Sequence, residues 1–200
     1  MIVNKTEMWI TPVWEIQTDF DTQFNDELLC EASKYCDPNS NDFNFNIWNC
    51  EGNRIQELRE YTLKIVKAQT YDYISPNFND FEFWHTRGWI NYNEPGHSMP
   101  IHGHGGPKIA MTYYVKAPDN CGDLLLIDPR NGCDWDAGTD GVNGTKFNRI
   151  KPVESKLVFF PGFVLHMVEA NKSQLPRISL TSNMGTFDSS TIEILKNTIL

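Results

Sequence analysis

Three histidines have a spacing that suits a metal ion. His102 and His104 stand two residues apart, and His166 lies in a later segment, soon after the turn-forming pair Pro161-Gly162. Successive side chains of a β-strand alternate between its faces, so residues two apart share a face and can reach one ion. Three imidazoles would hold a metal and leave positions open for substrate, water or oxygen. The alternative for such histidines is a hydrogen-bonded structural role.

Arg177 is a fourth candidate, eleven residues beyond His166. A hairpin between residues 164–169 and 177–183 would bring Arg177 back close to His166. A guanidinium binds a carboxylate through two parallel hydrogen bonds, and Ser179 on the same face can add a hydroxyl. These residues predict a carboxylate-binding site beside the metal, although Arg177 alone would also suit a surface ion pair.

The elements that must position these residues fall into two groups, with helices before strands. Residues 8–17 alternate as a first strand, near an edge because of Pro12. The apolar spacing predicts helices over residues 22–35, with Asp21 as N-cap, and over residues 52–67. The Asn-rich segment between them predicts a loop.

From residue 81 onward, short alternating or β-branched runs are separated by Gly, Pro, Asn and Asp. This pattern of short strands and turn residues predicts an antiparallel double sheet. The predicted fold class is therefore mainly β, a double-stranded β-helix (jelly roll) with supporting N-terminal helices. We expect a single domain over residues 1–200, a mobile insertion at 132–145 and a closing helix at 189–200. The expected strands are 81–85, 88–92, 99–103, 109–116, 123–127, 147–150, 157–160, 164–169 and 177–183.

Composition limits the partners. The net charge of -9 argues against general nucleic-acid binding, which rests on clustered Lys and Arg. No run approaches the roughly 18 apolar residues that span a bilayer, and the start of the chain lacks the pattern of a signal peptide. We therefore expect a cytoplasmic protein without a membrane segment. Its five cysteines lack paired spacing and suit reduced thiols.

Several short segments follow one another in a recognisable order. They are Trp89-Ile90-Asn91, Gly96, His102-Gly103-His104, Tyr113-Tyr114-Val115, Gly122-Asp123-Leu124, Asp128-Pro129-Arg130, Phe159-Phe160-Pro161, His166 and Arg177-Ile178-Ser179 through Asn183. Together they resemble one known family, the 2-oxoglutarate- and iron(II)-dependent oxygenases seen in marine bacteria and cyanophages, which are similar to prolyl hydroxylases. If the chain is phage-encoded, the expected location is the host cytoplasm.

The resemblance implies a 2-oxoglutarate-dependent dioxygenase whose cofactors are Fe(II) and 2-oxoglutarate and whose other co-substrate is O2. It implies Fe(II) ligation by His102, by the residue two after it and by His166. The distal carboxylate of 2-oxoglutarate would lie on Arg177, aided by Ser179 and Tyr114, with Asn91 also in reach. The hydroxylated substrate is open, and analogy alone suggests a peptidyl proline.

The chain departs from the family pattern at His104, where the wider superfamily has Asp or Glu. Either three histidines bind the iron, or His104 only supports the site and a water, Glu94 or Asp128 completes it. His85 and His97 are expected to be structural or substrate-facing. Phe83 and Trp84 suit core packing as well as a substrate wall.

Two other readings stay open. The His102-x-His104 and Pro161-Gly162 to His166 spacing also looks like cupins, which are metal-dependent enzymes and binding proteins. Cupins have a Glu four or five residues after the paired histidines, where this chain has Lys108 and Ile109. The last alternative is a non-enzymatic jelly-roll binding module with a structural metal.

Overall fold

The computed structural model of the chain describes residues 10–37, 46–74, 81–128 and 147–199. No helix within these ranges is both long and apolar enough to cross a bilayer. In chain order the elements are β1 (Trp14–Gln17), α1 (Thr22–Ala32), η1 (Ile47–Asn49), α2 (Asn53–Ile74), β2 (Glu82–Asn93), β3 (Met99–His102), β4 (Ile109–Lys116), β5 (Leu124–Ile127), β6 (Phe147–Ile150), β7 (Lys156–Pro161), β8 (His166–Val168), β9 (Arg177–Phe187) and α3 (Ser189–Ile199).

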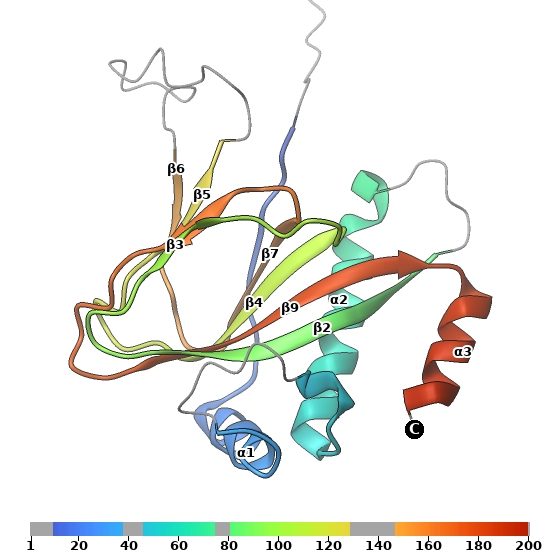
Figure 1. Cartoon of the computed structure of the whole chain (residues 1–200), viewed down its shortest axis with the longest axis horizontal. Coiled ribbons are helices and arrows are strands. Elements are labelled where there is room, and N and C mark those ends of the chain that lie inside the picture. Colours follow the sequence, from blue (N-terminus) through green and yellow to red (C-terminus); the bar gives the residue numbers. More distant parts are fainter. Residues whose placement is uncertain (1–9, 38–45, 75–80, 129–146, 200) are drawn as a thin grey trace, which may run out of the picture.

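The described strands form two antiparallel sheets. One has five strands in the order β1-β7-β4-β9-β2, and the other has four in the order β3-β8-β5-β6. Figure 1 shows α1 and α2 lying along one side of the five-stranded sheet, away from β3, β5 and β6. The predicted mainly β architecture with supporting N-terminal helices is confirmed.

The alternation of β9 divides its side chains between two environments. Ile178, Leu180 and Met184 belong to the apolar core shared with the helices. Residues 177, 179, 181 and 183 point to the other face and line a cavity between the sheets. This division follows from the two-residue period of a strand.

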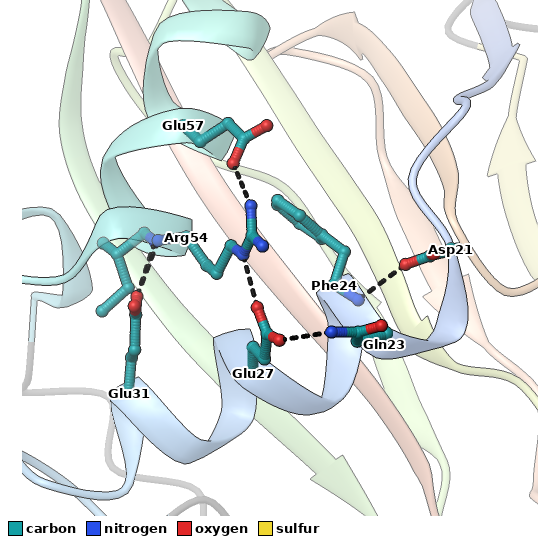
Figure 2. Close-up of polar contacts among 8 residues, drawn as sticks. Asp21, Gln23, Phe24, Glu27, Glu31, Arg54 and Glu57 are labelled. Atoms are coloured by element: carbon teal, nitrogen blue, oxygen red, sulfur yellow. Dashed lines mark hydrogen bonds and ion pairs between the residues drawn. The ribbon is translucent and has the colours of Figure 1, made fainter.

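The two N-terminal helices are joined by polar contacts at their ends. Asp21 caps α1 by accepting a hydrogen bond from the amide of Phe24 at 2.8 Å, as predicted. At the start of α2 the amides of Arg54 and Ile55 donate to Glu31 Oε2, at 2.8 and 3.1 Å. Figure 2 shows Glu31 reaching from α1 to α2, beside the Arg54 contacts with Glu27 and Glu57. The carboxylate of α1 thus caps α2.

Element bounds differ from the prediction in several places. The two strands predicted at 81–85 and 88–92 are one strand, β2, which begins at Glu82. A register shift between His85 and Arg87 marks a β-bulge, and the pairing of β2 with β9 continues on both sides of it. Within the described part of the predicted strand 8–17, β1 covers residues 14–17, and residues 8 and 9 lie outside the described residues. The helix α2 extends to Ile74. The loop before Cys50 contains η1, and the predicted insertion at 132–145 lies outside the described residues.

The predicted hairpin of residues 164–169 with 177–183 is wrong. β8 pairs with β3 and β5, whereas β9 pairs with β2 and β4, so the two strands lie in different sheets. The connection crosses from one sheet to the other, and its turn is held by Asn171, whose Nδ2 donates to the backbone oxygens of Asn93 and Leu175. Arg177 and His166 therefore line one cavity from opposite walls.

Candidate metal and co-substrate site

A cavity of about 330 Å³ lies between the two sheets. Polar side chains along three adjacent strands form much of one wall, and the opposite wall carries histidines and apolar groups. The five-stranded sheet contributes Arg87, Trp89, Asn91, Asn93, Ala110, Thr112, Tyr114, Phe160, Arg177, Ser179, Thr181 and Asn183, and the other wall includes Met99, His102, His104, Leu124, His166 and Val168.

Three imidazoles converge in this cavity. One ligand atom from each of His102, His104 and His166 lies within 4.8 Å of the others. His102 and His166 are direct cross-strand partners in the β3–β8 pair, with ring centres 4.2 Å apart. His104 does not lie on the strand as predicted, since β3 ends at His102. Its amide donates to the carbonyl of Gly162 at 3.3 Å, which holds the residue beside the other two.

Hydrogen bonds and burial prepare the imidazoles as metal ligands. Nδ1 of His102 lies 2.9 Å from the carbonyl of Pro100, and Nδ1 of His166 lies 2.9 Å from that of Val164. A carbonyl can only accept, so each Nδ1 carries the proton and each Nε2 keeps its lone pair. Burial lowers the pKa of His166 to about 4, against the backbone hydrogen bond to Val164, and burial also lowers the pKa of His104. Neutral imidazole is the form that binds metals.

Arg177 lies at one end of the cavity and is only 2% exposed. Its Nη1 donates to the carbonyls of Cys121 and Gly122, both at 2.9 Å. Among the described residues its Nε is buried without a hydrogen-bond partner, and no carboxylate forms an ion pair with the guanidinium. A buried charge without a counterion is costly, so this arrangement suits an anionic ligand.

Tyr114 and Ser179 lie beside the guanidinium as a cross-strand pair of β4 and β9. Burial raises the pKa of Tyr114, although the charge of Arg177 acts in the opposite direction. The phenol therefore keeps its proton at neutral pH. Together with the Ser179 hydroxyl it offers two donors to a carboxylate on Arg177.

Asn91 lines the same cavity, but its amide is already engaged. Its Oδ1 accepts from Trp89 Nε1 at 3.1 Å, and its Nδ2 donates to Thr181 Oγ1 at 2.6 Å. This chain of contacts orders the wall next to His104, whose ring centre is 6.0 Å from that of Trp89. Asn91 keeps one N–H for a ligand.

The remaining candidates lie away from the three histidines. Glu94 and Asp128 are absent from the cluster of described residues that could hold a metal ion. His85 is buried against Trp48, between Thr62 and Ser182. His97 lies outside the cavity with its Nδ1 2.9 Å from Asn93 Nδ2.

Phe83 and Trp84 are core residues. Phe83 belongs to the apolar cluster beneath the helices, and the Arg59 guanidinium lies 4.3 Å from the Trp84 ring centre. Neither lines the cavity. The residues that the sequence analysis missed are Arg87 and Thr181, and it quoted Asn183 only as part of a motif. Residues two apart on a strand share a face, so Arg87 lies on the face of Trp89, and Thr181 and Asn183 lie on the face of Ser179. This spacing could have identified them from the sequence.

Comparison with known proteins agrees with this geometry. Residues 87–183 match the family described as "Putative 2OG-Fe(II) oxygenase". Residues 87–183 thus have the sequence pattern of the 2OG-Fe(II) oxygenases. The matched segment runs from Arg87 to Asn183 and contains all three histidines and Arg177. No curated protein sequence matches the chain.

Solved structures of prolyl hydroxylases share the fold. A viral collagen prolyl hydroxylase from Paramecium Bursaria Chlorella virus-1 aligns with a TM-score of 0.57 at 14% identity, over 92% of this chain and 98% of that one. A Pseudomonas putida prolyl-4-hydroxylase gives 0.54 at 16% identity, over 86% and 85% of the two chains. A Trichoplax adhaerens prolyl hydroxylase, solved with a hypoxia inducible factor peptide, gives 0.56 at 13% identity, over 91% and 86%.

The family uses Fe(II) and 2-oxoglutarate, and the residues present fit both. Imidazole nitrogens are good ligands for iron, although the usual third ligand of this class is a carboxylate. The buried Arg177, with its unpartnered Nε, fits the distal carboxylate of a small diacid. The chain thus has the fold and donor groups of a 2-oxoglutarate-dependent dioxygenase.

Proposed function

We propose that this 2OG-Fe(II) oxygenase holds Fe(II) with His102, His104 and His166, and seats 2-oxoglutarate on Arg177 with help from Ser179 and Tyr114. The observation that carries the proposal is the buried Arg177, which has no anionic partner in the described chain and lines the cavity of the three imidazoles. Neither a cupin nor a structural metal site gives a reason for that guanidinium.

The chain's own groups would do three things in the reaction. Arg177 fixes one end of the co-substrate, so that its other end points toward the imidazoles. The neutral phenol of Tyr114 and the Ser179 hydroxyl donate to the same carboxylate without adding charge. Leu124 and Val168 would offer apolar surface to the co-substrate from the opposite wall. Bound Fe(II) and 2-oxoglutarate supply the activation of O2 and the oxidising equivalents for hydroxylation.

The second substrate is the finer part of the proposal. One of the similar structures is named as a collagen prolyl hydroxylase, and another as a prolyl hydroxylase in complex with a hypoxia inducible factor peptide fragment. A peptide containing proline is therefore the first class to test for this chain, on the strength of that likeness.

The test is a titration of the anaerobic Fe(II) protein with 2-oxoglutarate, followed by visible absorption. The wild type should develop a new band, and Arg177→Ala should weaken 2-oxoglutarate binding at least about 30-fold. Truncating one partner of a buried charge pair costs about 2 kcal/mol or more, which corresponds to that factor. Arg177→Lys should lose less, because it keeps the charge but not the fork.

Lys64→Ala serves as the control, since Lys64 is an exposed residue of α2 outside the cavity. It should bind 2-oxoglutarate like the wild type. The proposal fails if 2-oxoglutarate gives no spectral change, or if succinate and 2-oxoglutarate bind equally well and Arg177→Ala leaves both unchanged.

A further inference from the structure

The cavity has a second polar end, opposite Arg177. Arg87 of β2 and Asn183 of β9 are direct cross-strand partners, and both line the cavity. Asn183 lies six residues beyond Arg177, and at about 3.3 Å per residue the two ends are about 20 Å apart along β9. The cavity is therefore an elongated space with an arginine at each end.

The imidazoles lie across the cavity from the middle of the β9 residues that line it. Trp89 pairs with Thr181, halfway between Ser179 and Asn183, and the Trp89 ring centre is 6.0 Å from that of His104. If 2-oxoglutarate occupies the space between the metal and Arg177, as the proposed function requires, the half near Arg87 is left for the molecule that is oxidised. A five-carbon diacid is too short to fill both halves.

Both groups at this end are prepared for a ligand. Asn183 Oδ1 is buried and has no hydrogen-bond partner among the described residues, and such an acceptor normally finds a donor. Arg87 is exposed at the rim, forms no ion pair within the described chain, and places its guanidinium carbon 5.8 Å from the Trp89 ring centre. A cation held against an aromatic face keeps its N–H edge free for an anion.

We propose that Arg87 and Asn183 bind the oxidised substrate through a terminal carboxylate and a neighbouring N–H or O–H group. Arg87 takes the carboxylate in bidentate fashion, and Asn183 Oδ1 accepts from the donor. Cross-strand partners have Cα atoms about 4.5 to 5.5 Å apart, so the two ligand groups must be close together. An α-carboxylate and its adjacent N–H meet this condition, whether they belong to a free amino acid or to the C-terminus of a peptide. An internal peptidyl proline offers neither group, so this inference favours a free amino acid or a peptide C-terminus over the internal proline that the likeness to prolyl hydroxylases suggests.

The test measures binding to the anaerobic protein loaded with Fe(II) and saturating 2-oxoglutarate, by calorimetry. The probes are a panel of L-amino acids, their carboxamides, and tripeptides ending in the same residues with a free or amidated C-terminus. We expect at least one free-carboxylate probe to bind about tenfold or more tightly than its amide, the loss expected for one hydrogen-bonded charge contact. Tight binding by amino acids points to a small-molecule substrate, and tighter binding by the tripeptides points to a peptide end.

Arg87→Ala should abolish this preference for the carboxylate, and Arg87→Lys should retain part of it. Asn183→Leu should weaken the binding of the free acids that carry the N–H or O–H donor. Lys64→Ala, which also removes one positive charge, should keep the wild-type preference. Equal binding of acids and amides by the wild type, absence of any response to the acids, or an unchanged preference in Arg87→Ala overturns the inference. If 2-oxoglutarate itself does not bind to the wild type, the proposed function fails instead.

Discussion

At the scale of single residues, the unusual feature is an imidazole where this class of enzymes has a carboxylate. His104 is neutral because burial and the nearby His102 lower its pKa. A divalent metal held by three neutral ligands keeps its full charge, whereas a carboxylate would cancel one unit. If the proposed metal binds here, its full charge should attract an anionic co-substrate more strongly, in the same cavity where Arg177 is proposed to bind a carboxylate.

Replacing His104 tests whether it is a ligand. His104→Ala should lower Fe(II) affinity at least about tenfold, because a metal site that loses one of three protein ligands is under-coordinated, whereas His104→Asp should retain binding through a carboxylate. The measurement is a metal-binding titration of each variant. His97→Ala is the matched control, since His97 lies outside the cavity. Equal affinity of the Ala variant and the wild type would remove His104 from the ligand set.

At the scale of elements, the site depends on a sheet that the helices support from behind. Ile55, Leu58 and Val66 of α2 are buried in the same apolar core as Ile178 and Leu180 of β9. The neighbours of Leu180 in sequence, Ser179 and Thr181, face the cavity. The apolar core that includes α2 thus lies behind the strand β9, whose other face forms part of the cavity wall.

Glu31 fixes one end of α2, so its removal should lower stability. Its Oε2 accepts from two backbone amides that have no partner within the helix, and the absence of a side chain at Gly52 leaves room for it. Glu31→Ala should reduce the free energy of unfolding by about 1 to 2 kcal/mol, the usual cost of losing a helix cap with its charge. Urea denaturation measures this.

Glu60→Ala provides the comparison, because Glu60 is an exposed residue of α2 and an exposed surface change of this kind usually stays within about 0.5 kcal/mol. If both variants lose the same stability, the contact of Glu31 with α2 does not stabilise the protein. The exposed ion pairs of Arg54 with Glu27 and Glu57 should contribute less than this cap.

At the scale of the whole molecule, the sequence predicted elements better than it predicted how they meet. The strand at 109–116 has the predicted bounds, and Asp21 caps α1 as expected, since both depend on residues close in sequence. The predicted hairpin between the strands of His166 and Arg177 was wrong, because strand pairing depends on contacts between residues that are far apart in the sequence. The pairing of Arg87 with Asn183 was missed for the same reason, since only the register of β2 against β9 brings them together.

The same long-range packing makes stability depend on pH through His85. This residue is 2% exposed, stacks on Trp48 with ring centres 4.1 Å apart, and contacts Thr62 and Ser182 through its two ring nitrogens. Burial first, and then the charge of Arg59, lower the pKa of His85 to about 3. Elements from both halves of the chain would have to separate before it could be protonated.

In the unfolded chain His85 titrates near its ordinary pKa, about 6.5, so below that pH the unfolded state binds a proton that the folded state refuses. Stability should therefore fall with decreasing pH from about 6.5 toward about 3, by about 1.4 kcal/mol per pH unit for this residue. Urea denaturation of the metal-free protein between pH 7 and pH 5 gives the slope. His85→Gln keeps hydrogen-bonding groups but cannot titrate, so its slope should be smaller by that amount. His104 and His166 are present in both proteins, so their contribution to the slope is the same. If the free energy of unfolding changes equally with pH in the wild type and in His85→Gln, His85 does not make stability depend on pH.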